Sequence, residues 1–205
     1  MDKIEIDDKQ IIPIDDIAPG VRGLRIAFVN VFALTHPDGS WSLIDAALPF
    51  SASHIKNWAE KHFDHPPNSL ILTHGHFDHV SAAKDLAESW DIPVYAHSLE
   101  FPYLTGQKEY PKPNVGAGGG MMTLLSPLYP RSPVNIGERL ITLPNQDSVA
   151  SASDSGSLAD LPGLPGWKIL HTPGHTPGHV SFFRPADGTL IVGGCFLHDQ
   201  AGVVL

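Results

Sequence analysis

Cysteine is almost absent from this sequence, because Cys195 is the single cysteine among 205 residues. One thiol excludes an internal disulfide and is typical of proteins that stay in a reducing compartment. The sequence also has no apolar run long enough to cross a bilayer, and its acidic N-terminus has no cationic start followed by an apolar core. We therefore expect no membrane span, no signal peptide and a cytoplasmic location.

Positive charge is also scarce, with 13 Lys and Arg residues against 22 Asp and Glu residues and a formal net charge of -9. Such a chain repels phosphate backbones, and no basic patch stands out. We therefore expect a small-molecule substrate and no nucleic-acid partner. With 205 residues and 42% hydrophobic content, the chain can bury the core of one domain spanning residues 1–205.

Histidine is concentrated in two short segments, each directly after an apolar run. In the first, residues 69–73 have the pattern of a buried strand, and residues 80–90 carry apolar side chains at helical spacing. Residues two apart in extended backbone point to the same side, and imidazole and carboxylate groups are ligands that Zn²⁺ accepts at roughly 2.0–2.2 Å. The loop between strand and helix therefore predicts a metal site. Its candidate ligands are His74, His76, Asp78 and His79.

The second segment, residues 170–179, contains two Pro-Gly-His repeats. Proline fixes φ and glycine admits conformations closed to other residues, so this loop can hold an imidazole with little entropy left to lose. We expect His175 to be a fifth ligand. We expect His171 and His179 to support the site or pack in the core instead of binding metal.

Together the two segments resemble the metallo-β-lactamase superfamily. Residues 74–79 match its H-x-H-x-D-H signature, and His175 lies in its P-G-H-T-P-G-H loop. Residues 43–45 resemble the family's early L-I-D-T-G element, in which Asp45 would be a structural hydrogen-bonding residue near the site. Residues 188–193 resemble the strand that leads into its Gly-Asp motif. The resemblance covers about residues 29–197. Within the superfamily, the chain is similar to the glyoxalase II and lactonase-like branch of metal-dependent hydrolases.

This resemblance implies an α/β fold, the αββα sandwich, with metals in a cleft at one edge of the two sheets. By the family pattern His74, His76 and His175 hold one metal, while Asp78 and His79 contribute to another. The implied cofactor is zinc, one or two ions per chain, with iron or manganese as alternatives. The implied reaction is hydrolysis of a small ester, lactone, thioester or β-lactam by a metal-activated water that Asp78 orients.

The sequence departs from the family pattern in two places. Gly194 stands where the family has the aspartate that bridges both metals, and the family's last histidine ligand would lie beyond Leu205. The resemblance thus implies a second half that lacks its last part, whose apolar sheet surface a homodimer could cover. Three neighbours of Gly194 could act as substitute ligands, although the first also suits a small buried position. They are Cys195, His198 and Asp199.

Two functions therefore remain open. The chain could be an active metal-dependent hydrolase, or a catalytically impaired or inactive homologue that keeps only the three-histidine site. The impaired homologue is considered because two metal dications without a bridging carboxylate repel each other. This repulsion opposes the binding of two ions at the site. A third reading, a mononuclear iron enzyme of the persulfide dioxygenase type, also needs the aspartate that Gly194 replaces.

The rest of the pattern predicts alternating strands and helices. Residues 105–133 are expected to form either a lid over the metal cleft or a short helix closing the core, and residues 145–166 a flexible surface loop. Helices are expected at 51–63 and 80–90, strands of the first sheet at 25–34, 41–45, 69–73 and 93–97, and strands of the second sheet at 139–143, 167–171, 179–183 and 189–192.

Overall fold

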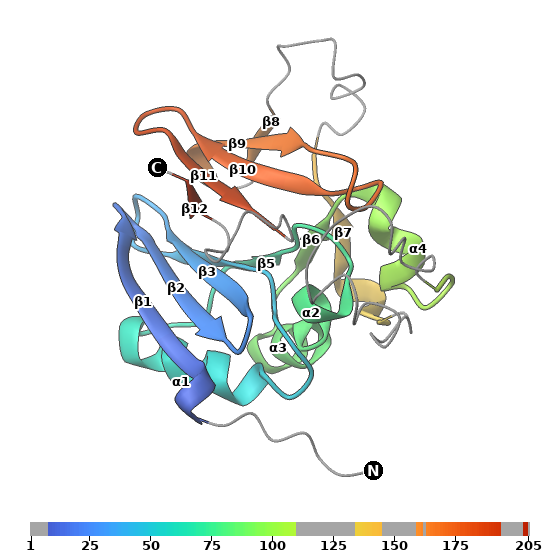
Figure 1. The fold of residues 1–205 in the computed structure, drawn as a ribbon, viewed down its shortest axis with the longest axis horizontal. Coiled ribbons are helices and arrows are strands. Elements are labelled where there is room, and N and C mark those ends of the chain that lie inside the picture. The colour runs from blue at the N-terminus through green and yellow to red at the C-terminus, as the bar shows by residue number, and fades with distance from the viewer. Residues whose placement is uncertain (1–7, 110–133, 145–158, 162, 194–202, 205) are drawn as a thin grey trace.

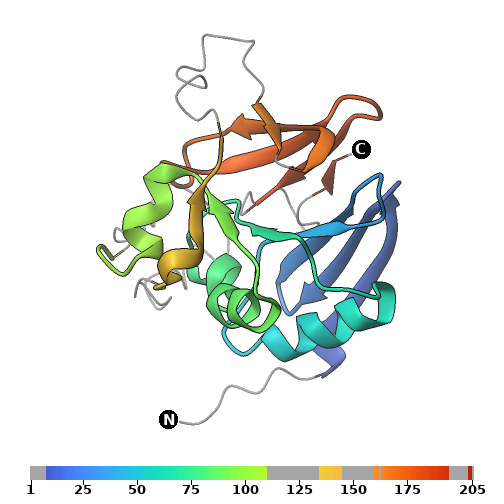
Figure 2. The same ribbon diagram turned by 180° about the vertical axis from the view of Figure 1, so that it is seen from behind.

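The computed structural model describes residues 8–109, 134–144, 159–161, 163–193, 203 and 204. Two β-sheets lie face to face, and helices cover the outer face of the larger sheet (Figure 1). The view from behind shows the same three layers (Figure 2). They agree with the predicted sandwich, and the described residues include no helical layer on the outer face of the smaller sheet.

The larger sheet has seven strands whose spatial order follows the sequence. Its first four strands form an antiparallel meander, and the last four are parallel neighbours. The strands are β1 (Ile11–Ala18), β2 (Val21–Ile26), β3 (Val29–Thr35), β4 (Trp41–Ile44), β5 (Ser69–Ile71), β6 (Val94–Ala96) and β7 (Leu140–Thr142).

Parallel strands need crossover connections, and here these connections carry the helices. The first crossover is α1, the second contains α2 and α3, and the third begins with η2 and α4. The helices are η1 (Asp8–Gln10) before the sheet, then α1 (Ala52–His62), α2 (Phe77–Val80), α3 (Ala83–Trp90), η2 (Ser98–Glu100), α4 (Phe101–Leu104) and η4 (Gly137–Arg139).

The smaller sheet has five strands in the spatial order β12-β11-β10-β9-β8, and every neighbouring pair is antiparallel. The long loop between β9 and β10 is the second histidine segment, so it lies at one end of this sheet. The strands are β8 (Ala159–Leu161), β9 (Leu164–His171), β10 (Val180–Arg184), β11 (Thr189–Val192) and β12 (Val203–Val204).

Strand β3 shows why the larger sheet lies in the middle of the molecule. Its side chains alternate between two hydrophobic clusters: Val29, Val31 and Ala33 pack with the helices, whereas Phe32 and Leu34 pack against the smaller sheet. Successive side chains of a strand point to opposite faces, so a strand with apolar side chains on both faces is covered on both sides. The period of two thus fixes the order of the layers.

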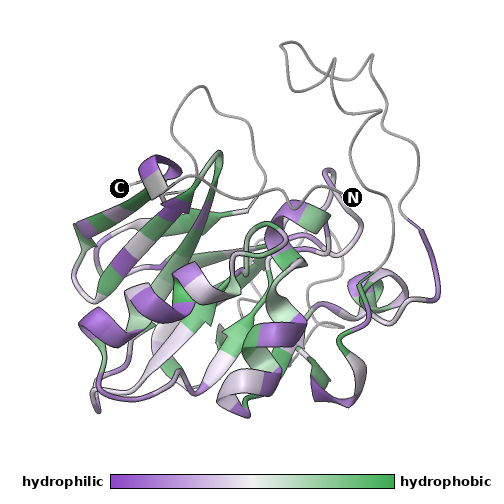
Figure 3. Cartoon of the chain, turned by 90° about the horizontal axis from the view of Figure 1, so that it is seen from below, coloured by the Kyte–Doolittle hydropathy of each residue, from purple (hydrophilic) through white to green (hydrophobic). Residues whose placement is uncertain are grey.

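The helical layer is amphipathic. In α1, Ile55, Trp58 and Ala59 recur at helical spacing and are buried, and the helix ends where Phe63 turns to extended backbone. Phe63 stacks on Trp41 of β4 with ring centroids 4.2 Å apart. Figure 3 shows hydrophilic and hydrophobic segments alternating along the helices.

Two predicted elements are interrupted. The strand predicted at 25–34 is wrong, because Ala27 and Phe28 form a two-residue turn between β2 and β3, with φ 55° at Ala27 and no glycine or proline to announce it. The helix predicted at 80–90 breaks into α2 and α3 at Ser81 and Ala82, where the Ser81 hydroxyl donates to the Phe77 carbonyl one turn earlier.

Two predicted placements are also corrected. The sequence pattern predicts a strand of the second sheet at 139–143, but the observed strand β7 pairs in parallel with β6 in the first sheet. Pairing partners are set by the crossover, which periodicity does not report. In the predicted surface loop 145–166, residues 159–161 form β8 and residues 164–166 begin β9, while residues 145–158 lie outside the described residues.

Candidate metal centre

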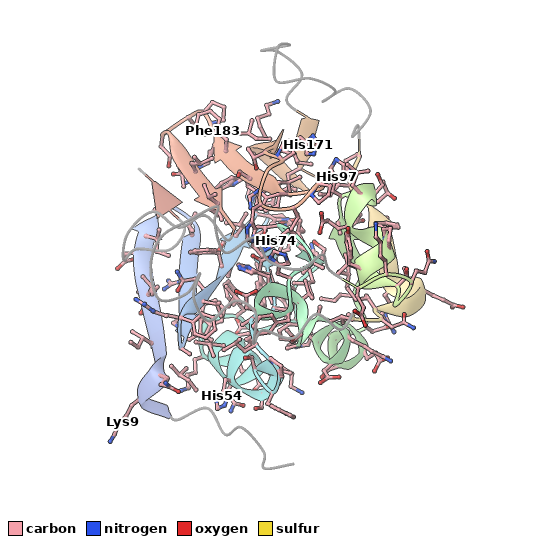
Figure 4. All side chains as sticks on the ribbon, turned by 45° about the vertical axis from the view of Figure 1, so that its right-hand side comes forward. Lys9, His54, His74, His97, His171 and Phe183 are labelled. Carbon is pink, nitrogen blue, oxygen red and sulfur yellow. The ribbon has the colours of Figure 1, made fainter. Side chains whose placement is uncertain are left out.

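Three histidines predicted as ligands meet at the junction of the two sheets. His74 and His76 come from the loop after β5, and His175 from the loop between β9 and β10. One potential ligand atom from each lies within 4.8 Å of the others, and His76 Nδ1 is 2.8 Å from His175 Nε2. Figure 4 shows His74 near the centre of the molecule, below the smaller sheet. Two segments far apart in sequence therefore build one group of imidazoles.

His74 presents a free nitrogen lone pair to this group. The Thr73 hydroxyl donates its proton to Asp45 Oδ2 at 2.8 Å, so it can only accept from His74 Nδ1, 3.0 Å away. His74 thus carries its proton on Nδ1. Its Nε2 is buried and has no hydrogen-bond partner among the residues that the structure describes. A buried acceptor without a partner is costly, so the site fits a metal ion that would use that lone pair.

The three histidines are held in the neutral form that a metal requires. Burial, reinforced by the neighbouring imidazoles, lowers the pKa of His74 well below its ordinary value. Burial, together with His175, His79 and His179, lowers the pKa of His76 to about 3. For His175, loss of solvent together with His179 and His79 lowers the pKa to about 4. The donor set of three neutral imidazoles suits Zn²⁺ and other divalent transition metals.

Asp78 and His79 adjoin this group from the first turn of α2. The rings of His74 and His79 have centroids 4.3 Å apart, and His79 Nε2 is 3.9 Å from Asp78 Oδ2. Neither belongs to the three-residue ligand group found among the described residues. Burial opposes the charge on His79, but attraction and a hydrogen bond from Asp45, with a further contribution from Asp78, raise its pKa overall.

Asp45 organises both sides of the site. Its carboxylate accepts hydrogen bonds from the Thr73 backbone N–H and hydroxyl, and lies 2.7 Å from His79 Nδ1. The residue has φ 62°, a left-handed conformation that aspartate tolerates better than most residues. One buried carboxylate therefore fixes the Nδ1 proton of His79 directly and that of His74 through Thr73.

The two other histidines of the second loop use their nitrogens within the protein. His179 is fully buried, with Nδ1 2.8 Å from the Thr172 hydroxyl and Nε2 bonded to the Gly193 carbonyl. His171 Nε2 donates to the Pro177 carbonyl at 2.8 Å, and its ring stacks on His97 (Figure 4). These contacts are those of supporting residues.

The end of β11 reaches the same place. A Cβ on Gly193 would lie 2.1 Å from the Thr73 hydroxyl, so only glycine allows this close approach to the residue before His74. Four residues that bear on a second metal follow at once, and all of them lie outside the described residues. They are Gly194, Cys195, His198 and Asp199.

Sequence reasoning missed Thr73 and Glu100. Thr73 directly precedes the first histidine. Its hydrogen bonds to Asp45 and His74 become evident only in the structure, where Asp45 faces it. Glu100 is 1% exposed and hydrogen-bonds to backbone in both histidine loops. A glutamate after a short strand gives no signal of that role in a single sequence.

Comparison with known proteins assigns a family to this arrangement. Residues 24–193 match the family model described as the metallo-beta-lactamase superfamily. The chain is 41% identical over 183 residues to the probable metallo-hydrolase YflN of Bacillus subtilis (strain 168), covering 87% of this chain and 64% of YflN. It is 32% identical over 134 residues to the probable metallo-hydrolase YybB of the same strain, covering 65% of this chain and 48% of YybB.

Solved structures share the fold. A B3 metallo-beta-lactamase with an active-site glutamic acid superposes with a TM-score of 0.59 at 18% identity, over 90% of this chain and 57% of that one. TTHA1623 in a di-iron-bound form superposes with a TM-score of 0.53 at 24% identity, over 91% and 73%. The chain spans less than two-thirds of the curated relatives named above. Among the described residues, no helix is both long and apolar enough to span a membrane.

Proposed function

Because the chain belongs to the metallo-β-lactamase superfamily, we propose that it is a metal-dependent hydrolase of a small ester, lactone, thioester or β-lactam. The observation that carries the proposal is the buried Nε2 of His74, which has no partner in the described part of the chain and belongs to a residue grouped with His76 and His175. The proposed ligands of one ion are these three histidines. Zinc is the first choice of metal, and iron or manganese are the alternatives.

A bound divalent cation would supply a water that ionises near neutral pH and would polarise a carbonyl oxygen of the substrate. The chain's own residues do the rest. Asp78 is partly exposed, with 24% of its side chain accessible, so its carboxylate could orient the water by accepting a hydrogen bond from it. His79 is held by Asp45 through Nδ1, which leaves Nε2, on the side of Asp78, as the nitrogen that could bind a second ion.

The setting is proposed to be the cytoplasm, with a small molecule as substrate. A single cysteine supports a reducing compartment, and a net charge of -9 disfavours nucleic acids. The substrate class stays broad because these reactions share one metal centre.

The first experiment measures metal per chain by elemental analysis after dialysis against metal-free buffer, then turnover of a panel of activated esters, lactones, thioesters and β-lactams. We expect chelator-sensitive turnover that His76→Ala reduces beyond the about 10–100-fold caused by changes outside the ligand shell. The control is His65→Ala, which removes an exposed imidazole in the loop after α1.

The outcomes separate the candidate functions. About one or two ions per chain with turnover supports the hydrolase. Bound metal without turnover on any substrate supports the impaired homologue, for which Gly194 is the sequence argument. No metal in the folded wild-type chain contradicts both.

A further inference from the structure

Glu100 is a buried carboxylate outside the group of candidate ligands. It ends η2 and directly precedes α4, in the crossover from β6 to β7, and is 1% exposed. Unpaired buried carboxylates are expensive, so those that persist have hydrogen-bond partners. The partners of Glu100 identify its role.

Its two oxygens divide between the two histidine loops. Oε2 accepts the backbone N–H of Gly75 at 3.0 Å, and Oε1 accepts that of Gly178 at 2.7 Å. Gly75 separates His74 from His76, and Gly178 lies three residues after His175. One side chain therefore bridges backbone on both sides of the three-histidine group.

Gly178 is shaped for this contact. A Cβ at that position would lie 2.8 Å from both Cγ and Oε1 of Glu100. Its φ is outside the left-handed region, so backbone strain does not require glycine there. The absence of a side chain is what lets the carboxylate reach the amide.

The Glu100 bridge joins parts of the two histidine loops that the backbone hydrogen bond between them does not reach. The loops are also joined by the Val180 N–H, which donates to the Thr73 carbonyl at 2.9 Å, next to the strand ends. That bond lies before His74 and after His179, whereas the Glu100 bridge reaches the turns that carry His76 and His175. Those two imidazoles come from loops of different sheets, and His76 Nδ1 lies 2.8 Å from His175 Nε2.

We infer that Glu100 is a positioning residue that sets the spacing of the two histidine loops and thereby the metal affinity of the site. The inference rests on the proposed metal centre. A carboxylate offers an acceptor to each loop, whereas glutamine offers one acceptor and turns an N–H₂ group toward the other backbone N–H. One loop then loses its anchor while the side-chain volume is nearly unchanged.

The test is titration with Co²⁺, followed by its visible absorption, on the full chain stripped of metal. We expect Glu100→Gln to raise the dissociation constant by about tenfold or more, and to change the absorption spectrum at saturation. Glu60→Gln makes the same chemical change at an exposed position of α1 and should bind Co²⁺ as the wild type does. Ile55→Val, a mild change in the helical core, controls for general loss of stability.

Gly178→Ala provides a second test that keeps the carboxylate, and it carries the test alone if Glu100→Gln does not fold. We expect weaker Co²⁺ binding here as well. If both single variants fold, the alanine should add little to the effect of Glu100→Gln in the double variant, because both changes break the same contact. Circular dichroism of each metal-free variant establishes that folded chains are being compared.

The outcomes are distinguishable. Wild-type affinity and spectrum in folded Glu100→Gln or folded Gly178→Ala overturn the role of Glu100 and leave the proposed function standing. Equal weakening by Ile55→Val also overturns it, because the effect would then follow stability alone. A wild-type chain that takes up no Co²⁺ overturns the proposed metal centre, and this inference with it.

Discussion

At the scale of single residues, the site is organised by acceptors as much as by metal ligands. Asp45 illustrates this, since one carboxylate holds Thr73 by two hydrogen bonds and His79 by a third contact of 2.7 Å. Because Thr73 passes the effect on to His74, two imidazoles depend on a residue that would touch no metal. The chemistry of the ligands is therefore fixed one layer away from them.

Replacement of Asp45 by asparagine tests this dependence. Asparagine fits the left-handed backbone but offers one acceptor where Thr73 and His79 need more, so we expect Asp45→Asn to lose about 1.5–3 kcal/mol of unfolding free energy. The pKa of His79 should fall, because the Asp45 charge raises it. Urea denaturation of the metal-free chain and NMR titration of His79 measure both, with the exposed Asp64→Asn as control. An unchanged unfolding midpoint would contradict this account.

The sequence was informative about residues that share a short segment. His74, His76, Asp78 and His79 lie within six positions, so the short length of chain between them alone keeps them near one another. Glu100 and Gly178 are 78 positions apart, and their contact exists only after the two sheets dock. Local patterns cannot report such a pair.

At the scale of elements, hydrophobic periodicity predicted the helices and strands whose buried and exposed faces differ clearly in hydrophobicity. It predicted α1 and the strands β9, β10 and β11 close to their observed bounds. It failed at the turn between β2 and β3, because residues 26–29 are all apolar and include no typical turn residue. It also failed for the placement of β7, since a strand of three residues carries too little pattern to select a sheet.

The β3–β4 hairpin holds a buried histidine that should make stability depend on pH. His36 is 6% exposed, with Nε2 2.9 Å from the Ser42 hydroxyl and Nδ1 3.1 Å from the Ser40 hydroxyl. Burial lowers the pKa of His36, and the charge of Asp38 offsets this only in part. The unfolded chain, with an ordinary pKa near about 6.5, then binds a proton more readily than the folded chain.

The contribution of His36 to the unfolding free energy should therefore be present in full above about pH 6.5 and be lost as the pH falls below that value. We expect His36→Gln to flatten the fall in unfolding free energy between about pH 7 and pH 5, whereas His65→Gln, on an exposed side chain, should leave the slope as it is. Urea unfolding at several pH values measures the slope for each variant. Equal slopes in wild type and His36→Gln would show that this histidine does not contribute.

At the scale of the whole molecule, a metal ion would join the two sheets. The larger sheet supplies His74 and His76, and the smaller sheet supplies His175. A ligand that binds only the folded chain stabilises it by about 2.7 kcal/mol when the free ligand concentration is a hundred times the dissociation constant. For a chain of this length that is a rise of roughly 5–10 °C in Tm.

We expect thermal denaturation to show this rise with Zn²⁺ and its reversal by a chelator. His76→Ala should melt at the same temperature with and without Zn²⁺, because one of the three imidazoles is gone. An equal rise in that variant would mean that the ion acts elsewhere on an acidic surface.

The separation of the two histidine loops also bears on how the chain reaches its structure. His76 and His175 are 99 positions apart, whereas β1 to β4 pair only with their sequence neighbours. Contacts between distant segments form slowly, since the intervening chain must first be ordered. The ion's complete binding site therefore exists only late in folding. Metal would then prolong the lifetime of the folded chain without hastening its formation.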